Sequence, residues 1–189
     1  MMRPVLAGLA VAAMSGCMME PVPAPLPTDA EGSDVPVLGS VTGFVAGDPT
    51  LWETLDYSVG APDASVAILS DGERTELTIE AFPAGTNGQR AGRIEMRATL
   101  PNGPVPGPAG TTVIVLHDGD GVDGPQYQST GVPLVNVTAL TRTDGLYGAA
   151  TGTFVATLCR VGEPDAPPDL SDCVDLAAEF ETGLQFKSS

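Results

Sequence analysis

The fold is decided by two stretches of sequence, ATGTFVATLCR at residues 150–160 and CVDLAAEFETGLQF at residues 173–186. In both stretches apolar side chains recur at every second position, the period at which the side chains of a β-strand return to the same face. We therefore expect two paired strands that share one apolar face. The residues of that face are Ala150, Gly152, Phe154, Ala156 and Leu158 in the first strand, and Val174, Leu176, Ala178, Phe180, Leu184 and Phe186 in the second.

Two cysteines set the register of this hairpin. Cys159 and Cys173 both fall on the opposite, outward parity, and the residues between them are rich in proline and acids. If the two cysteines sit directly across from each other, every apolar pair meets at once and Gly152 lies under Phe180, leaving room for the ring. We expect a disulfide bond here, worth about 3 kcal/mol for a loop of about 15 residues in the chain-entropy model.

The rest of the domain repeats short apolar runs punctuated by turn residues such as Asp71-Gly72 and Asp144-Gly145. No stretch shows a sustained helical period. The predicted strands are residues 37–45, 65–69, 74–82, 92–100, 111–117, 133–141, 149–160 and 174–186, and residues 51–57 fit either a short strand or a helical turn. About eight strands at this spacing predict an all-β domain over residues 37–187, a single antiparallel β-sandwich or, alternatively, a small β-barrel.

A second hairpin is predicted within residues 74–100, where charged and apolar residues alternate on both strands. We expect Glu76 and Glu80 to face Arg93 and Arg97 across the solvated side of this hairpin. Cross-strand pairs of opposite charge stabilise a sheet by roughly 0.2–1 kcal/mol each. Their role is structural.

Residues 1–16 have the shape of a secretion signal. A positive start is followed by an apolar stretch at residues 5–14, which is too short for a membrane-spanning helix of about 20 residues. The stretch ends in MSGC, which resembles the lipobox of bacterial lipoproteins, with Met14 where that class usually has Leu. The resemblance implies cleavage before Cys17, a diacylglycerol on its sulfur, and acylation of the new amine by a chain such as palmitate. The alternative is an ordinary signal peptide with an incidental cysteine.

Residues 17–36 are expected to form a disordered, proline-rich and acidic tether. Met18 replaces the Asp that commonly retains Gram-negative lipoproteins in the inner membrane, so the resemblance favours a lipid-anchored protein of the bacterial outer membrane facing the periplasm or the surface. The pattern GTFVATLC…DCVDLAAEF is also similar to the closing hairpin of small secreted bacterial β-sandwich proteins of unknown function, and this likeness implies no activity.

The charge balance restricts the partners. Acidic residues outnumber Lys and Arg 24 to 8, for a formal net charge of −16. A nucleic-acid partner is excluded because its phosphates require cations, and electrostatic docking on anionic lipids fails for the same reason. An envelope protein or a glycan remains as the expected partner, with the membrane reached through the lipid anchor.

Catalytic motifs are not evident. His117 is the only histidine, no G-x-S-x-G motif is present, and one free histidine cannot build a zinc site without several carboxylates. Trp52, Tyr57, Tyr127 and Tyr147 are the candidates for an aromatic sugar-binding platform, although Trp52 fits equally well as a plug at one end of the sandwich. We therefore predict no catalytic residues.

The most suggestive segment is HDGDGVDGPQ, residues 117–126. Asp118, Asp120 and Asp123 supply carboxylates for a calcium ion, which takes six to eight oxygen ligands. Val122 and Ser129 stand where an EF-hand loop requires ligands, and Asp-Gly pairs are also ordinary hairpin turns. A calcium site and a plain acidic loop both remain open.

These observations predict a non-enzymatic envelope lipoprotein with a binding or structural role at the membrane periphery. The alternative is a calcium-dependent binding module or an envelope enzyme that uses the acidic loop at residues 118–123.

Overall fold

The computed structural model describes residues 35–56, 67–71, 75–86, 88, 91–119, 126–143, 145–162 and 166–188. All regular elements in these ranges are strands, and no helix in them could cross a membrane. The strands are β1 (Val37–Val45), β2 (Asp48–Leu55), β3 (Ala67–Asp71), β4 (Thr75–Pro83), β5 (Ile94–Leu100), β6 (Gly107–Pro108), β7 (Thr112–His117), β8 (Gln126–Arg142), β9 (Tyr147–Val161) and β10 (Asp169–Ser188). Cys17, the predicted leader and nearly all of the predicted tether lie outside the described residues.

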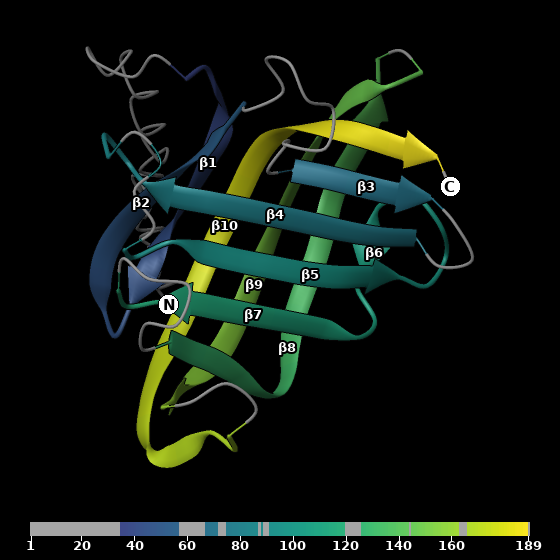
Figure 1. Ribbon diagram of the computed structural model, residues 1–189. Coiled ribbons are helices and arrows are strands. Elements are labelled where there is room, and N and C mark those ends of the chain that lie inside the picture. Colours follow the sequence, from purple (N-terminus) through teal and green to yellow (C-terminus); the bar gives the residue numbers. More distant parts are fainter. Residues whose placement is uncertain are drawn as a thin grey trace, which may run out of the picture. The chain divides into compact units, whose positions relative to one another are not determined.

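The strands form one sheet that closes on itself. Its hydrogen-bonded order is β1-β2-β4-β3-β10-β9-β8-β7-β5, β5 also pairs with β4, and β6 joins β8. Strands β3, β4, β5 and β7 make a layer that crosses β8, β9 and β10 at a steep angle (Figure 1). The pairings are antiparallel except for β3 with β10. The predicted all-β architecture, a sandwich or small barrel, is confirmed.

Strand β10 is the element that joins the layers. It runs along β9 for most of its length. On its other edge it pairs first with β1, up to Gly39 opposite Thr182, and then with β3, from Ile68 opposite Gln185. The change of partner falls around Gly183. A single long strand therefore holds the β1–β2 hairpin and closes the ring of strands.

The hairpin of β9 and β10 adopts the predicted register. Cys173 lies opposite Cys159, with which it forms the predicted disulfide, and Val174 lies opposite Leu158. Phe180 lies opposite Gly152, where an added Cβ would sit only 2.5 Å from the ring of Phe180. The glycine is required here because the aromatic ring occupies the space that a side chain would need.

The apolar core consists of the inward residues of these strands. Inward and outward positions alternate on β9 as predicted, so that Phe154 is buried while Val155 is exposed. Trp52 of β2 is also buried in the core, and its indole Nε1 donates a hydrogen bond to the Gly92 carbonyl at 2.7 Å. The largest buried core residues include Leu69, Leu77, Ile94, Met96, Ile114, Leu158 and Leu176.

Strand β8 differs most from its predicted bounds. It begins at Gln126, although the sequence predicted a strand only from residue 133. The first half of β8 is largely polar and therefore shows no apolar alternation. Proline is common at the first residue of a strand, so Pro133 indicated a strand start at the wrong place. The strand continues through a bulge in which residues 131–133 oppose the single residue Ala156 of β9. The two-residue strand β6 was also missed, since it is too short to show a period.

Other boundaries were ambiguous or shifted. Residues 51–57 proved to belong to a strand, β2, as far as residue 55. On the β4–β5 hairpin the predicted pair of Glu80 and Arg93 forms. The pairing of Glu76 with Arg97 was wrong, because the register places Thr78 opposite Arg97, which instead binds Glu95 of its own strand at 2.6 Å.

Candidate functional site

The outward side of four neighbouring strands, β8, β9, β10 and β1, carries an unexpected group of apolar residues. The ladders place Leu134 opposite Val155, Val155 opposite Ala177, and Ala177 opposite Phe44. One residue from each strand is thereby aligned across the sheet. We call these four residues, together with Val132, the apolar row.

The side chains of the apolar row are open to solvent. Val132 is 80% exposed, Leu134 71%, Phe44 56% and Val155 51%. Isolated exposed apolar residues are common on protein surfaces, whereas a contiguous group of large ones marks an interaction site. The continuity of the row across four strands is therefore its informative property.

An irregular backbone segment lies at each end of the row. At one end the β8 bulge contains Gly131 at φ +71°, a conformation that favours glycine, and turns Val132 outward. At the other end Ala46 (φ 52°) and Gly47 (φ 89°) form the two-residue turn between β1 and β2, directly beyond Phe44. Two positive φ angles are those of a type I′ hairpin turn.

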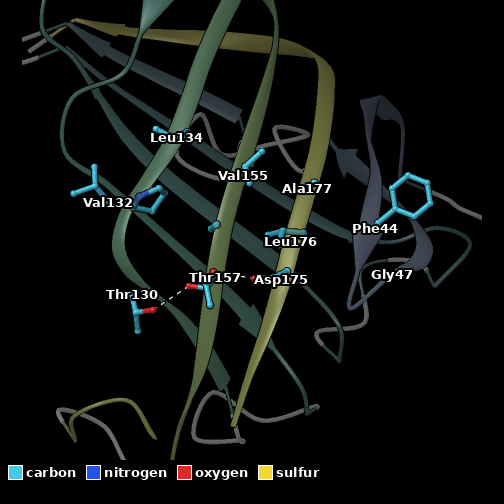
Figure 2. A pocket seen from close by; sticks show the side chains of 12 residues that line it. Phe44, Gly47, Thr130, Val132, Leu134, Val155, Thr157, Asp175, Leu176 and Ala177 are labelled. Carbon is cyan, nitrogen blue, oxygen red and sulfur yellow. Dashed lines mark hydrogen bonds between the residues drawn. The ribbon is translucent and has the colours of Figure 1, made fainter. Parts of the chain in front are cut away.

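The row borders an open hollow of about 550 Å³ (Figure 2). Ala177 and Val155 lie in the middle of this view, between Phe44 on one side and Val132 and Leu134 on the other. The hollow is lined by Phe44, Gly47, Thr130, Val132, Pro133, Leu134, Val155, Ala156, Thr157, Asp175, Leu176 and Ala177.

Polar residues border the row on both sides. On one side the hydroxyl of Thr157 donates to Oδ1 of Asp175 at 2.9 Å, and the hydroxyl of Thr130 donates to the Thr157 carbonyl at 3.3 Å. On the other side the next outward residues of β10 are Glu179 and Glu181, both exposed. The apolar row is thus a strip between polar margins that carry Asp175 on one side and Glu179 and Glu181 on the other.

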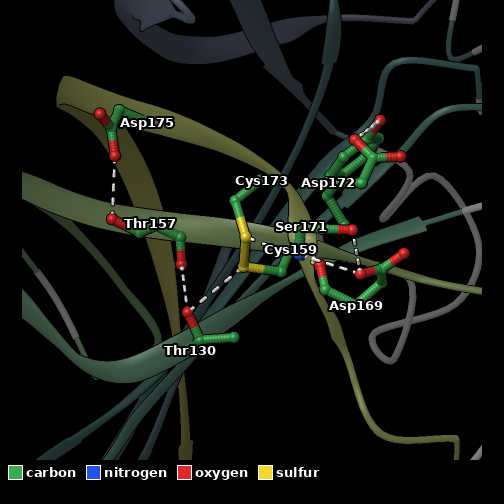
Figure 3. The surroundings of a disulfide bond; sticks show 9 residues. Thr130, Thr157, Cys159, Asp169, Ser171, Asp172, Cys173 and Asp175 are labelled. Atoms are coloured by element: carbon green, nitrogen blue, oxygen red, sulfur yellow. Dashed lines mark hydrogen bonds between the residues drawn. A yellow bond between two sulfur atoms is a disulfide. The ribbon is translucent and has the colours of Figure 1, made fainter.

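The disulfide lies on the same outward face, beyond Thr130 and Thr157 (Figure 3). Cys159 is buried, and its Sγ lies 3.6 Å from the hydroxyl of Thr130. Near the start of β10, hydrogen bonds from the hydroxyl and the backbone N–H of Ser171 lower the pKa of the exposed Asp169 carboxyl. This end of the outer face is therefore polar, and the disulfide links β9 to β10 there.

The predicted calcium ligands are only partly described. Asp118 lies 3.8 Å from Arg160 in an ion pair, whereas Asp120 and Asp123 lie outside the described residues. Within the described part of the chain, no group of three or more His, Cys, Asp or Glu is arranged to hold a metal ion. The calcium site therefore stays a prediction.

Arg160 also joins a cluster with Tyr127 and Asp172. Its guanidinium lies 3.3 Å from Asp172 and 5.7 Å from the centre of the Tyr127 ring. The pKa of Tyr127 is raised above 10.0, first by desolvation and then by the hydrogen bond that its hydroxyl donates to Asp172 at 3.2 Å. The cluster connects β8, β9 and β10 close to Asp118.

His117 lies elsewhere, at the end of β7. It is buried, and its Nε2 is 2.9 Å from the guanidinium of Arg93, which also pairs with Glu80. Because a guanidinium only donates hydrogen bonds, Nε2 is the acceptor in this contact. His117 does not line the hollow beside the apolar row.

The three aromatic candidates for a sugar platform that the structure describes have different surroundings. Trp52 is only 1% exposed and packs in the core as a plug, so its face is not available to a sugar. Tyr147 is half-exposed, Tyr127 belongs to the Arg160 cluster, and Tyr57 lies outside the described residues. No sequence pattern predicted that these aromatic residues lie close to one another.

The sequence reasoning missed the apolar row. The available signal was weak: Val155 and Ala177 are apolar residues at positions of outward parity, and Val132 and Leu134 flank a proline. In the sequence, each of these residues is an isolated apolar residue, and only the strand order places them side by side. Comparison with known proteins adds no relative, since no protein-family model, curated protein or solved structure matches the chain.

Proposed function

We propose that this chain is a non-enzymatic envelope lipoprotein that binds another envelope component through the apolar row. The lipobox-like MSGC sequence and the proline-rich stretch after it support the anchor. The observation that carries the binding role is the row itself, with Phe44, Leu134 and Val155 aligned on an otherwise polar and acidic outer face.

The strength of such binding can be bounded. Fully covering a large apolar side chain contributes roughly 1.5–3 kcal/mol, and the four large residues of the row are already partly covered. Their gross contribution is then roughly 4–8 kcal/mol, against an association cost of about 4–15 kcal/mol. The row alone therefore supports weak binding, which confinement of both partners to one membrane would strengthen through effective concentration.

The binding role is tested by site-specific photo-crosslinking in intact cells. A photoreactive residue at Val132 is expected to give a discrete adduct that Leu134→Ser abolishes. The matched control is a photoreactive residue at Leu170, which is 76% exposed, close to the 80% exposure of Val132, but lies outside the row. Equal adducts from both positions, or adducts unaffected by Leu134→Ser, would remove the basis of the proposed binding role.

The anchor is tested separately. Wild-type protein is expected in the membrane fraction, with an N-terminal peptide whose mass includes a diacylglycerol and an acyl chain on Cys17. Cys17→Ser is expected to abolish both the modification and the cleavage of the leader. A mature wild-type protein that carries no lipid would overturn the lipoprotein assignment while leaving the binding role intact.

A further inference from the structure

The charge around the apolar row is of one sign. The central part of the outer face comprises residues 39–45 of β1, 130–139 of β8, 150–158 of β9 and 174–182 of β10. This part contains three acidic residues and no Lys, Arg or His. The acidic residues are Asp175, Glu179 and Glu181, all exposed.

These carboxylates are placed on both sides of the row. Asp175 lies two residues before Ala177 on β10 and lines the hollow, whereas Glu179 lies two residues after it. Asp175 accepts a hydrogen bond from Thr157, and no cation among the described residues forms an ion pair with any of the three carboxylates. The cations of β8, β9 and β10 stand near the strand ends, at Arg142, Arg160 and Lys187.

The dimensions of the row indicate the shape of its partner. From Leu134 to Phe44 the row crosses three inter-strand spacings, about 14 Å in all. An α-helix of about nine residues covers that length. A helix laid along the row would face it with an apolar stripe, and the residues beside the stripe would lie above Asp175 on one flank and Glu179 on the other.

From this arrangement we propose that the partner presents a short amphipathic helix whose apolar stripe is flanked by Lys or Arg. The inference rests on the proposed binding function of the apolar row and specifies its occupant by charge complementarity. A second copy of the chain fits less well, since a two-fold contact would bring the same three carboxylates on each copy together. An anionic lipid surface would be repelled in the same way.

The test uses three labelled helical peptides with the same leucine stripe, flanked by Lys, by Gln or by Glu. The full-length protein is held in nanodiscs of zwitterionic lipid, with empty nanodiscs as the blank, and binding is followed by fluorescence anisotropy. We expect the Lys peptide to bind roughly 2- to 25-fold more tightly than the Gln peptide, since two exposed ion pairs at 0.2–1 kcal/mol each add up to that range. The Glu peptide should bind most weakly, and added salt should shrink these differences.

Two pairs of variants separate the apolar and the charged contributions. Val132→Ser with Leu134→Ser should abolish binding of all three peptides, whereas Leu170→Ser should leave it unchanged. Asp175→Asn with Glu179→Gln should reduce the affinity for the Lys peptide to that for the Gln peptide, whereas the exposed Glu76→Gln should not. All of these positions are exposed, so we expect the substitutions to preserve the fold, and unchanged circular dichroism spectra will verify it.

The outcomes distinguish the two proposals. Equal affinities for the three peptides, all lost with Val132→Ser and Leu134→Ser, would overturn the cationic helix and leave the binding function standing. Binding unaffected by these two substitutions, or no binding at all, would overturn the inference. If the two substitutions instead abolish self-association in sedimentation, or binding to empty zwitterionic vesicles, the occupant is a second copy or a membrane and the cationic helix is rejected.

Discussion

The two faces of β9 and β10 place apolar side chains under opposite conditions. Phe154 and Val155 are neighbours in sequence, yet Phe154 is 2% exposed and Val155 is 51% exposed. On β10, Leu176 is buried while the adjacent Ala177 is exposed. The inner residues are held by the core, whereas packing in the core does not explain why the outer ones are aligned.

The two faces also differ in what stabilises them. The inner face is closed by packing in one register, as Gly152 beneath Phe180 illustrates. The outer face is braced by the disulfide and by threonine hydroxyls that hydrogen-bond across strands, among them Thr138 with Thr151 at 2.9 Å. The comparison teaches that apolar side chains stabilise the inner side of this sheet by packing, whereas the apolar side chains of the outer side are left available for contacts.

The largest expected effect is the loss of stability when an inner side chain of β9, and not an outer one, is shortened. Phe154→Ala should lower the free energy of unfolding by about 3–5 kcal/mol, because it leaves a cavity in the core. Val155→Ala, one residue away, should change it by less than about 1 kcal/mol. Urea unfolding followed by circular dichroism, with the disulfide intact, measures both variants. Comparable losses would show that the outer face also carries the stability of the fold.

A smaller effect on stability is expected when the disulfide of the outer face is removed. Replacing both Cys159 and Cys173 by Ala should destabilise the protein by about 3 kcal/mol, through the greater freedom of the unfolded chain. The measurement is the urea midpoint of the oxidised wild type against that of the double variant. Reduced wild type serves as the second reference, and it should match the variant. A midpoint unchanged by both treatments would contradict a stabilising role for the bond.

The smallest effect concerns the end of the sheet where Tyr127 meets water. Its folded-state pKa is raised above 10.0, first by desolvation. The associated stability is therefore complete below pH 10.0 and is lost as the pH rises through the raised folded pKa. Tyr127→Phe should remove this alkaline loss, and Asp172→Asn should lower the pKa of Tyr127.

Spectrophotometric titration of tyrosinate measures this pKa as the difference between wild type and Tyr127→Phe. Ser171→Ala is the control, because Ser171 hydrogen-bonds to Asp169 and not to Tyr127. A difference curve centred at or below the ordinary tyrosine pKa would refute the environment described for Tyr127.

The sequence by itself determined the local pairings. Alternation and the two cysteines specified the β9–β10 register, down to Gly152 beneath Phe180, because a slip of one residue would turn every apolar side chain outward. The alternation also specified the shared apolar face of β4 and β5, but not their register, since Ile79 lies opposite Met96 and not opposite Ile94 as the expected charge pairs require.

Only the tertiary structure decided the closure of the sheet and the apolar row. The parallel pairing of β3 with β10 joins segments far apart in the sequence, and no local pattern encodes it. The row likewise needs β1 beside β10, to place Phe44 next to Ala177, and the β8 bulge, to place Leu134 opposite Val155. Periodicity states which face a side chain occupies, whereas its neighbours on that face depend on strand order.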